Sequence, residues 1–171
     1  MVIFDLDQTL ADTSIAADLR RARRWRDVMA LAPSFKIYPG VTSLLTELHQ
    51  RGVPVAIVTK SPDMVAKALV AKHEWPITNI VGYHQVQRRK PDPEGLLLAM
   101  KAAGANPRDA FHIGDHPEDT EAALGAGMVA IGAEWGADDV EALRASKPHH
   151  LFGTVAELRS FVFKKFGCLN R

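Results

Sequence analysis

Two acidic side chains at the end of the first apolar run are the first residues that could do chemistry. Asp5 and Asp7 lie where residues 2–6, a short β-branched and aromatic stretch, would end as a buried strand. Ligands of a parallel sheet bind outside the carboxyl ends of its strands, so acids in this place indicate a site. Carboxylates about 4 Å apart repel by about 4 kcal/mol at an effective dielectric constant of about 20. The pair therefore predicts a neighbouring cation or proton, unless one acid caps the next turn and the other is solvated.

Two later segments offer groups that bind phosphate. Thr59 follows the second apolar run, and its hydroxyl, with the backbone amides of Lys60 and Ser61 at a helix start, would seat a phosphate oxygen. Lys90 precedes a Pro-Asp-Pro sequence, a rigid helix entry that would hold its ammonium group in place. These residues predict an anion-binding site beside the two acids.

A second pair of acids follows the fourth apolar run. Asp115 comes directly after Gly114, and Asp119 lies four residues later, in the first turn of the next predicted helix. At this spacing Asp115 and Asp119 can converge on one cation. Hard carboxylate oxygens suit Mg²⁺, which keeps several waters and takes one or two carboxylates plus a substrate phosphate.

The elements that position these residues are predicted from the alternation of short apolar runs with longer helical segments. This alternation is typical of βα units around a mostly parallel sheet, which makes the chain an α/β protein. The expected strands are residues 2–6, 53–58, 77–81, 110–113, 128–131 and a short edge strand at 149–152.

Helix boundaries follow from caps. Residues 41–48 carry a buried apolar stripe and end before Gly52. Ser61 and Asp92 each precede a proline, which predicts helices that begin at residues 62 and 93. The Thr154 to Glu157 capping box opens a last helix through about residue 165, and residues 167–171 are expected to fray.

Residues 11–38, called the cap segment below, interrupt the alternation. Their centre, residues 18–30, is predicted to form one helix, ringed by Arg20, Arg21, Arg23, Arg24 and Arg26. One hypothesis is a solvated face whose arginines pair with Asp18 and Asp27. The other is an anion-attracting cover over the end of the first strand.

Composition bounds the remaining possibilities. With 171 residues, 47% of them hydrophobic, the chain is expected to form a single domain, residues 1–171, with its own core. The 21 basic and 20 acidic residues give a net charge of +1, which disfavours a nucleic-acid or membrane-surface partner, although a local basic patch would still allow one. A lone cysteine, Cys168, and the lack of a leader or of a long apolar run predict a cytoplasmic protein.

The ordered motifs resemble the haloacid dehalogenase superfamily of phosphohydrolases. The resemblance covers nearly the whole chain and lies in Asp-x-Asp-x-Thr at 5–9, Thr59 after its strand, Lys90 before Pro-Asp-Pro, and Gly-Asp-x-x-x-Asp at 114–119. Tyr-Pro-Gly-Val at 38–41 and Trp-Gly at 135–136 are similar to the phosphoglycolate-phosphatase-like branch. The resemblance implies a Rossmann-like three-layer sandwich with a much reduced helical cap. It also implies a Mg²⁺-dependent phosphatase that works through an aspartyl-phosphate.

The resemblance also implies a role for each matching residue. Asp5 would be the nucleophile, and Asp7 the general acid that then activates water. Thr59 would bind phosphoryl oxygens, and Lys90 would neutralise charge on the phosphoryl group and the nucleophile. The Mg²⁺ ligands would be the Asp5 carboxylate, the Asp7 carbonyl and Asp115, with Asp119 binding the metal directly or through a neighbour.

This sequence departs from the family pattern in three places. Gln8 replaces the usual glycine, which puts the tightness of the first turn in question. His116 replaces a usual small residue, and its side chain could contact the site. The cap segment is about one helix, where relatives have several. A phosphorylated small molecule is the expected substrate, and an oligomeric neighbour could close the open site. The alternatives are a macromolecular substrate, such as a nucleic-acid end or a phosphoprotein, and a catalytically silent binding module.

Overall fold

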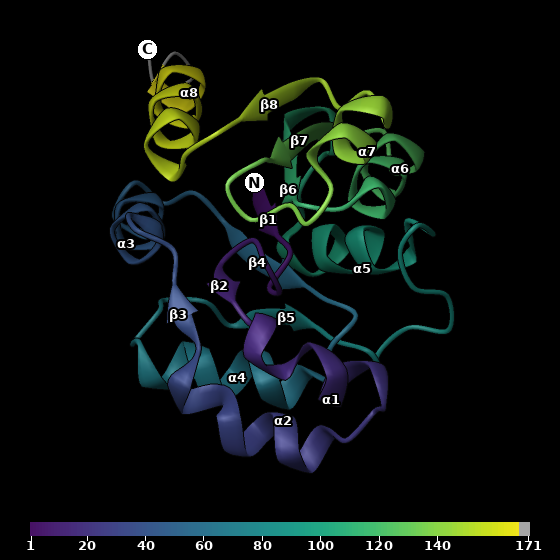
Figure 1. Ribbon diagram of the computed structural model, residues 1–171. Helices are drawn as coiled ribbons and strands as arrows, with labels where there is room; N and C mark the ends of the chain where they lie inside the picture. The colour runs from purple at the N-terminus through teal and green to yellow at the C-terminus, as the bar shows by residue number, and fades with distance from the viewer. Residues whose placement is uncertain (168–171) are drawn as a thin grey trace.

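The computed structural model describes residues 1–167. Within them, six strands form one parallel sheet in the order β5-β4-β1-β6-β7-β8 (Figure 1). The strands are β1 (Val2–Phe4), β4 (Val55–Val58), β5 (Asn79–Val81), β6 (Phe111–Gly114), β7 (Val129–Ala133) and β8 (His150–Phe152). Each lies in or next to a predicted run, and β8 is an edge strand as expected. The prediction of an α/β fold with a parallel sheet is confirmed.

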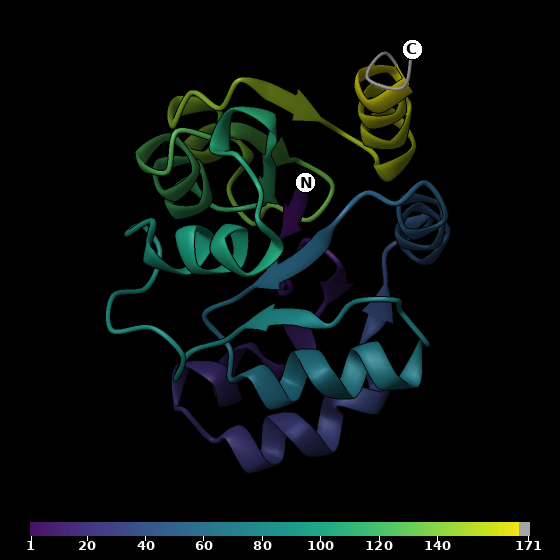
Figure 2. The same cartoon turned by 180° about the vertical axis from the view of Figure 1, so that it is seen from behind.

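Helices cover both faces of the sheet (Figures 1 and 2). On one face lie α3 (Val41–Gln50), α4 (Asp63–Lys72) and α8 (Val155–Gly167), and on the other α5 (Glu94–Ala103) and α6 (Pro117–Gly125), with α7 (Val140–Ala145) beside α6. Single 3-10 turns are η1 (Ser14–Ala16), η2 (Ala32–Ser34) and η3 (Pro107–Asp109). No helix in residues 1–167 is both long and apolar enough to cross a membrane.

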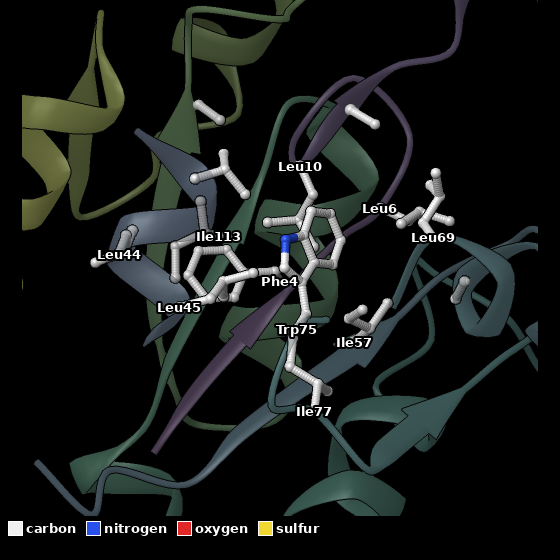
Figure 3. Close-up of a cluster of buried hydrophobic side chains, with 14 of the residues drawn as sticks. Phe4, Leu6, Leu10, Leu44, Leu45, Ile57, Leu69, Trp75, Ile77 and Ile113 are labelled. Atoms are coloured by element: carbon white, nitrogen blue, oxygen red, sulfur yellow. The ribbon is translucent and has the colours of Figure 1, made fainter. Parts of the chain in front are cut away.

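Alternating side chains of the central strands build two core layers. Phe4, Ile57 and Ile113 are paired in register across β1, β4 and β6 and share the larger cluster (Figure 3). Ile3 and Ala56 point to the smaller cluster under α5 and α6. Because both faces of β1 are buried, its end is fixed, and the acids that follow it are held in place.

Two predicted helix starts were wrong by one residue. The backbone of Pro62 is extended and precedes α4, which begins at Asp63, so Ser61 is not a cap. Likewise α5 begins at Glu94, and the backbone amide of Glu94 donates a hydrogen bond to the Asp92 carboxylate. The capping box of Thr154 and Glu157 is confirmed by reciprocal hydrogen bonds. Helix α8 extends to Gly167, and the expected fraying beyond it lies outside the described residues.

The single helix predicted in the cap segment is wrong. The chain forms α1 (Ala17–Arg21) and α2 (Trp25–Leu31), between a short antiparallel pair, β2 (Ala11–Asp12) and β3 (Lys36–Ile37). Arg23 has a φ of 54°, in the left-handed region. Its amide donates to the carbonyl of Arg20, and the amide of Arg24 donates to that of Leu19. This is a Schellman motif, a common helix ending that glycine usually makes.

The cap segment is anchored to the body of the protein. Val28, Ala32 and Phe35 are buried in the larger core cluster. Lys72 of α4 donates a hydrogen bond to the carbonyl of Pro33, and α2 and η2 contact α4 (Figure 2). The segment is thus part of the same packed layer as α4.

Candidate active site

A cavity of about 430 Å³ opens at the carboxyl end of the sheet. Its walls are residues that follow β1, β4, β5 and β6, joined by side chains of the cap segment. Five of the predicted site residues line it: Asp5, Asp7, Lys90, Asp115 and Asp119. Thr59 is buried behind this wall.

Lys90 joins two of the predicted acids. Its buried ammonium group donates to Oδ1 of Asp5 at 2.6 Å and to Oδ1 of Asp119 at 2.5 Å. Burial alone would lower the pKa of Lys90, but Asp119 and Asp5 hold that pKa above its usual value. Burial also opposes ionisation of Asp119, yet Lys90 and His112 keep the pKa of Asp119 well below its usual range. The expectation that the Lys90 ammonium is held in place is confirmed.

Burial and neighbouring acids oppose ionisation of Asp5 and Asp115. Burial, together with Asp119 and Asp7, raises the pKa of Asp5 to about 7 against the opposing effect of Lys90. Burial and the charges of Asp5 and Asp119 raise the pKa of Asp115 to about 8, although Thr9 donates to its Oδ1 at 2.7 Å.

Carboxylate oxygens of Asp5, Asp115 and Asp119 lie within 4.8 Å of one another. Three hard oxygen donors around an excess of negative charge suit a divalent cation such as Mg²⁺.

The Asp7 carboxylate accepts from four donors. Oδ1 is bonded by Arg20 Nη1 at 2.6 Å and by the Thr13 hydroxyl at 2.9 Å. Oδ2 is bonded by the hydroxyls of Ser61 at 2.7 Å and Thr59 at 3.3 Å. The orientation of Asp7 is therefore set by the loop that follows β4 and by the cap segment together.

The phosphate seat expected at Thr59 is partly occupied by internal contacts. The Thr59 hydroxyl donates to Asp7 and accepts from the amide of Ser61 at 3.0 Å. That amide is not at a helix start, since α4 begins at Asp63. Thr59 therefore contacts the site through Asp7, and Ser61 is nearer to the cavity.

Sequence reasoning missed several residues of the site. The sequence predicts the Ser61 backbone as part of a phosphate seat and a helix start, but it predicts no contact of the Ser61 hydroxyl with Asp7 and no role for Thr13. His112, expected only to lie inside a strand, is buried with Nε2 3.2 Å from Oδ1 of Asp119 and Nδ1 3.3 Å from the carbonyl oxygen of Ile3. Only the threonine of Asp-x-Asp-x-Thr gave a signal in the sequence, because the other contacts depend on tertiary packing.

Two glycines allow close approach around the acids. A Cβ atom on Gly114 would lie 2.2 Å from Cγ of Asp119, and one on Gly136 would lie 1.7 Å from the carbonyl oxygen of Gln8. Gln8 itself has a φ of 60°, the conformation for which the family's usual glycine is suited. The turn is therefore tight despite the replacement, and the Gln8 side chain accepts from the amide of Thr13.

His116 has a structural contact as well as a place on the cavity wall. Its Nδ1 accepts from the amide of Glu118 at 3.3 Å, and its own amide donates to Oδ2 of Asp119 at 3.1 Å. These two bonds form a capping box for α6, which fixes Asp119.

Some arginines of the cap segment fit the hypothesis of a solvated face, and others fit that of a cover over the first strand. Arg21 pairs with Asp18 at 2.8 Å and Arg24 with Asp27 at 2.6 Å, both on the exposed surface. Arg20, however, bonds Asp7, and Arg20, Arg21 and Arg23 line the cavity. Arg24 is on the solvated surface, Arg20 contacts the acids, and Arg21 is exposed at the rim of the cavity.

The chain is similar to known proteins in sequence and in fold. A family model described as haloacid dehalogenase-like hydrolase matches residues 15–133, a range that begins after Asp5 and Asp7. A phosphoglycolate phosphatase of Pseudomonas putida is 28% identical over 148 residues, which are 84% of this chain and 52% of that protein. The phosphoglycolate phosphatase of Escherichia coli K12 is 31% identical over 127 residues, 71% of this chain and 49% of that protein. The chain therefore spans about half the length of these relatives.

Among solved structures, a hydrolase from Pseudomonas syringae superposes with a TM-score of 0.81 at 22% identity. The superposition covers 95% of this chain and 97% of that one. At this identity the likeness supports the fold alone.

Proposed function

The chain belongs to the haloacid dehalogenase-like hydrolases, and on this basis we propose that it is a Mg²⁺-dependent phosphomonoester hydrolase acting through an aspartyl-phosphate on Asp5. The observation that carries the proposal is the contact of buried Lys90 with Asp5 and Asp119, next to Asp115. A carboxylate can attack a phosphate dianion only where cations neutralise the negative charges of both groups. Residues 1–171 are proposed to form one domain, with residues 11–38 as a minimal cap.

In the proposed reaction, Asp5 and Asp7 divide the work. A carboxylate oxygen of Asp5 forms a bond to phosphorus as the bond from phosphorus to the leaving oxygen breaks. Asp7 gives a proton to that leaving oxygen, and then takes a proton from the water that attacks the phosphorus of the aspartyl-phosphate. Thr59 and Ser61 orient Asp7 for both steps. Lys90 holds Asp5 and neutralises charge that develops beside it.

The metal would be held by the Asp5 carboxylate, the Asp7 carbonyl and Asp115. When bound, Mg²⁺ supplies positive charge to the phosphoryl oxygens. Both oxygens of Asp119 already accept hydrogen bonds, from Lys90 and from the amide of His116. We therefore propose that Asp119 supports the metal through its neighbours and is not a direct ligand.

Binding of Mg²⁺ is expected to stabilise the protein more at pH 8 than at pH 6. The raised pKa values of Asp5 and Asp115 mean that protons compete with the metal. Without metal, the folded state binds these protons more tightly than the unfolded chain, so stability is lost as pH rises from about 4 to about 8. Thermal unfolding with and without Mg²⁺ at both pH values measures this difference. An equal Mg²⁺ shift at the two pH values, or an undiminished shift in Asp115→Asn, would contradict it.

The proposed activity is tested by phosphate release from a broad panel of phosphomonoesters, with and without Mg²⁺. Mg²⁺-dependent release from a small ester supports a small-molecule phosphatase. Release only from a nucleic-acid end or a phosphopeptide would move the assignment to a macromolecular substrate. If no ester of any kind is hydrolysed, a binding module on the same fold would replace the proposal.

Arg20 is expected to contribute to substrate binding. It lies at the cavity wall with a side chain only 22% exposed, bonded to Asp7. In Arg20→Ala, loss of the bond from Arg20 to Asp7 should lower kcat. Loss of a charged donor to the bound ester, worth about 1.5–3 kcal/mol, should raise KM about tenfold or more. Arg26→Ala is the matched control, since Arg26 is exposed and lies outside the cavity wall. An unchanged KM in Arg20→Ala would refute a role of Arg20 in substrate binding.

A further inference from the structure

One wall of the cavity is aromatic. Trp25 of the cap segment and Tyr83, which follows β5, both line it, with ring centroids 6.4 Å apart and planes at 47°. The guanidinium group of Arg89 lies 3.7 Å from the centre of the Tyr83 ring, and its Nε donates to the Tyr83 carbonyl at 3.2 Å. Arg89 is not part of the cavity wall, so it fixes the Tyr83 ring from outside the cavity.

Trp25 differs from the other tryptophans in its polar contact. The indole N–H of Trp75 donates to Thr42, and that of Trp135 donates to the Thr9 carbonyl, each at 3.0 Å. Within residues 1–167, the Trp25 N–H has no protein acceptor. Trp25 is half-buried, with part of its ring packed on the core. Its polar edge remains available to water or to a bound molecule.

The break between α1 and α2 brings Trp25 to this place. Trp25 is the first residue of α2, two residues after the left-handed Arg23. The positive φ of Arg23 belongs to the Schellman motif that ends α1, and it sets the direction in which α2 starts. The same turn brings Arg23 to the cavity beside Arg20. The wall therefore combines flat rings with positive charge.

We propose that this wall receives the leaving group of a phosphomonoester that carries a flat aromatic ring, such as a nucleobase. The inference rests on the proposed function, since the ester phosphate would lie at Asp5 and Lys90. Aromatic side chains stack on bases with little regard to sequence, because every base has a π-face. A volume of about 430 Å³ is within the usual range of small-ligand pockets. The arginines attract the anionic ester as a whole.

The test compares adenosine 5′-phosphate with ribose 5-phosphate. In both, the phosphate is on the primary 5-hydroxyl of ribose, so they differ at C1, which carries the base or a hydroxyl group, and not in the bond that breaks. We expect kcat/KM to be about tenfold higher for the nucleotide, since stacking on one base is worth about that factor or more. Trp25→Leu and Tyr83→Leu should each remove most of this preference, while Trp25→Phe should keep it. Phe163→Leu, in α8 and outside the cavity wall, is the control for a general effect on folding.

The outcomes separate this inference from the proposed function. Equal kcat/KM for the two esters, or a preference that survives both leucine variants, would overturn the aromatic wall and leave the phosphatase intact. If another panel ester is hydrolysed and these two are not, the two are compared as inhibitors of that reaction. Equal inhibition constants would then overturn the aromatic wall. If no ester is hydrolysed, the phosphatase fails, and calorimetric binding of the two esters to the protein with Mg²⁺ still decides whether the base is recognised.

Discussion

Asp5→Asn is expected to reduce phosphate release by at least about a thousandfold, since variants without their nucleophile lose activity on this scale or more. The amide matches the carboxylate in size but cannot form the aspartyl-phosphate. Its effect on folding should be small, because Asp5 is a buried acid whose pKa is raised to about 7, and Lys90 keeps Asp119 as a partner. Steady-state phosphate release on the best panel ester, with thermal unfolding as a check, measures both.

A matched control for this variant is Asp27→Asn. Asp27 pairs with Arg24 at the surface, on the side of the cap segment away from the cavity. This control should keep wild-type activity. A tenth or more of wild-type activity in Asp5→Asn would show that Asp5 is not the nucleophile, whatever the fold.

Lys90→Met is expected to have the largest effect on stability. Removing one partner of a buried ion pair costs about 3–5 kcal/mol, because the remaining charges stay buried without compensation. Here two carboxylates, Asp5 and Asp119, would lose the same cation. The free energy of unfolding, from urea titration, should fall by this amount at neutral pH, and phosphate release should be lost as well.

The sign of the pH dependence provides a second measurement. Lys90 holds the pKa of Asp119 down, so the stability it provides is present above the unfolded pKa of an aspartate, about 4, and is lost as pH falls further. The difference between Lys90→Met and wild type should therefore shrink in acid. Lys67→Met is the matched control, since Lys67 is 63% exposed and pairs with Asp63 within one helix. It should cost less than about 1 kcal/mol, and an equal loss in both variants would contradict the role of Lys90.

The positions of the acids could be predicted because they depend on sheet topology. The carboxyl ends of β1 and β6 are neighbours in a parallel sheet, so residues that follow them must meet. The sequence places Asp5 and Asp115 each at the end of a predicted strand, and the family resemblance implies that they share a metal. The position of Asp119 followed from the helical spacing after β6. The position of Lys90 followed from the rigid Pro-Asp-Pro sequence that comes after it.

The contacts that surround these acids could not be predicted in the same way. His112 reaches Asp119 only because β6 and α6 pack together, and a histidine inside an apolar run carries no sign of this. Ser61 precedes a proline, as helix caps do, but the extended backbone of Pro62 leaves its hydroxyl to Asp7. The break at Arg23 needs a left-handed arginine, which local propensity disfavours. In each case tertiary packing overrides a local pattern.

The way the cap segment is anchored separates stability from selectivity. Val28, Ala32 and Phe35 hold it to the core, while Arg21 and Arg23 reach the cavity from its exposed side. Exposed substitutions away from the core usually change folding free energy by about 0.5 kcal/mol or less. Substitutions at Arg21, and at Arg23 those that accept a positive φ, can therefore accumulate without loss of the fold. If the proposed function holds, the cap segment is a surface on which natural selection, or a directed library, can exchange one substrate for another while the proposed catalytic acids stay unchanged.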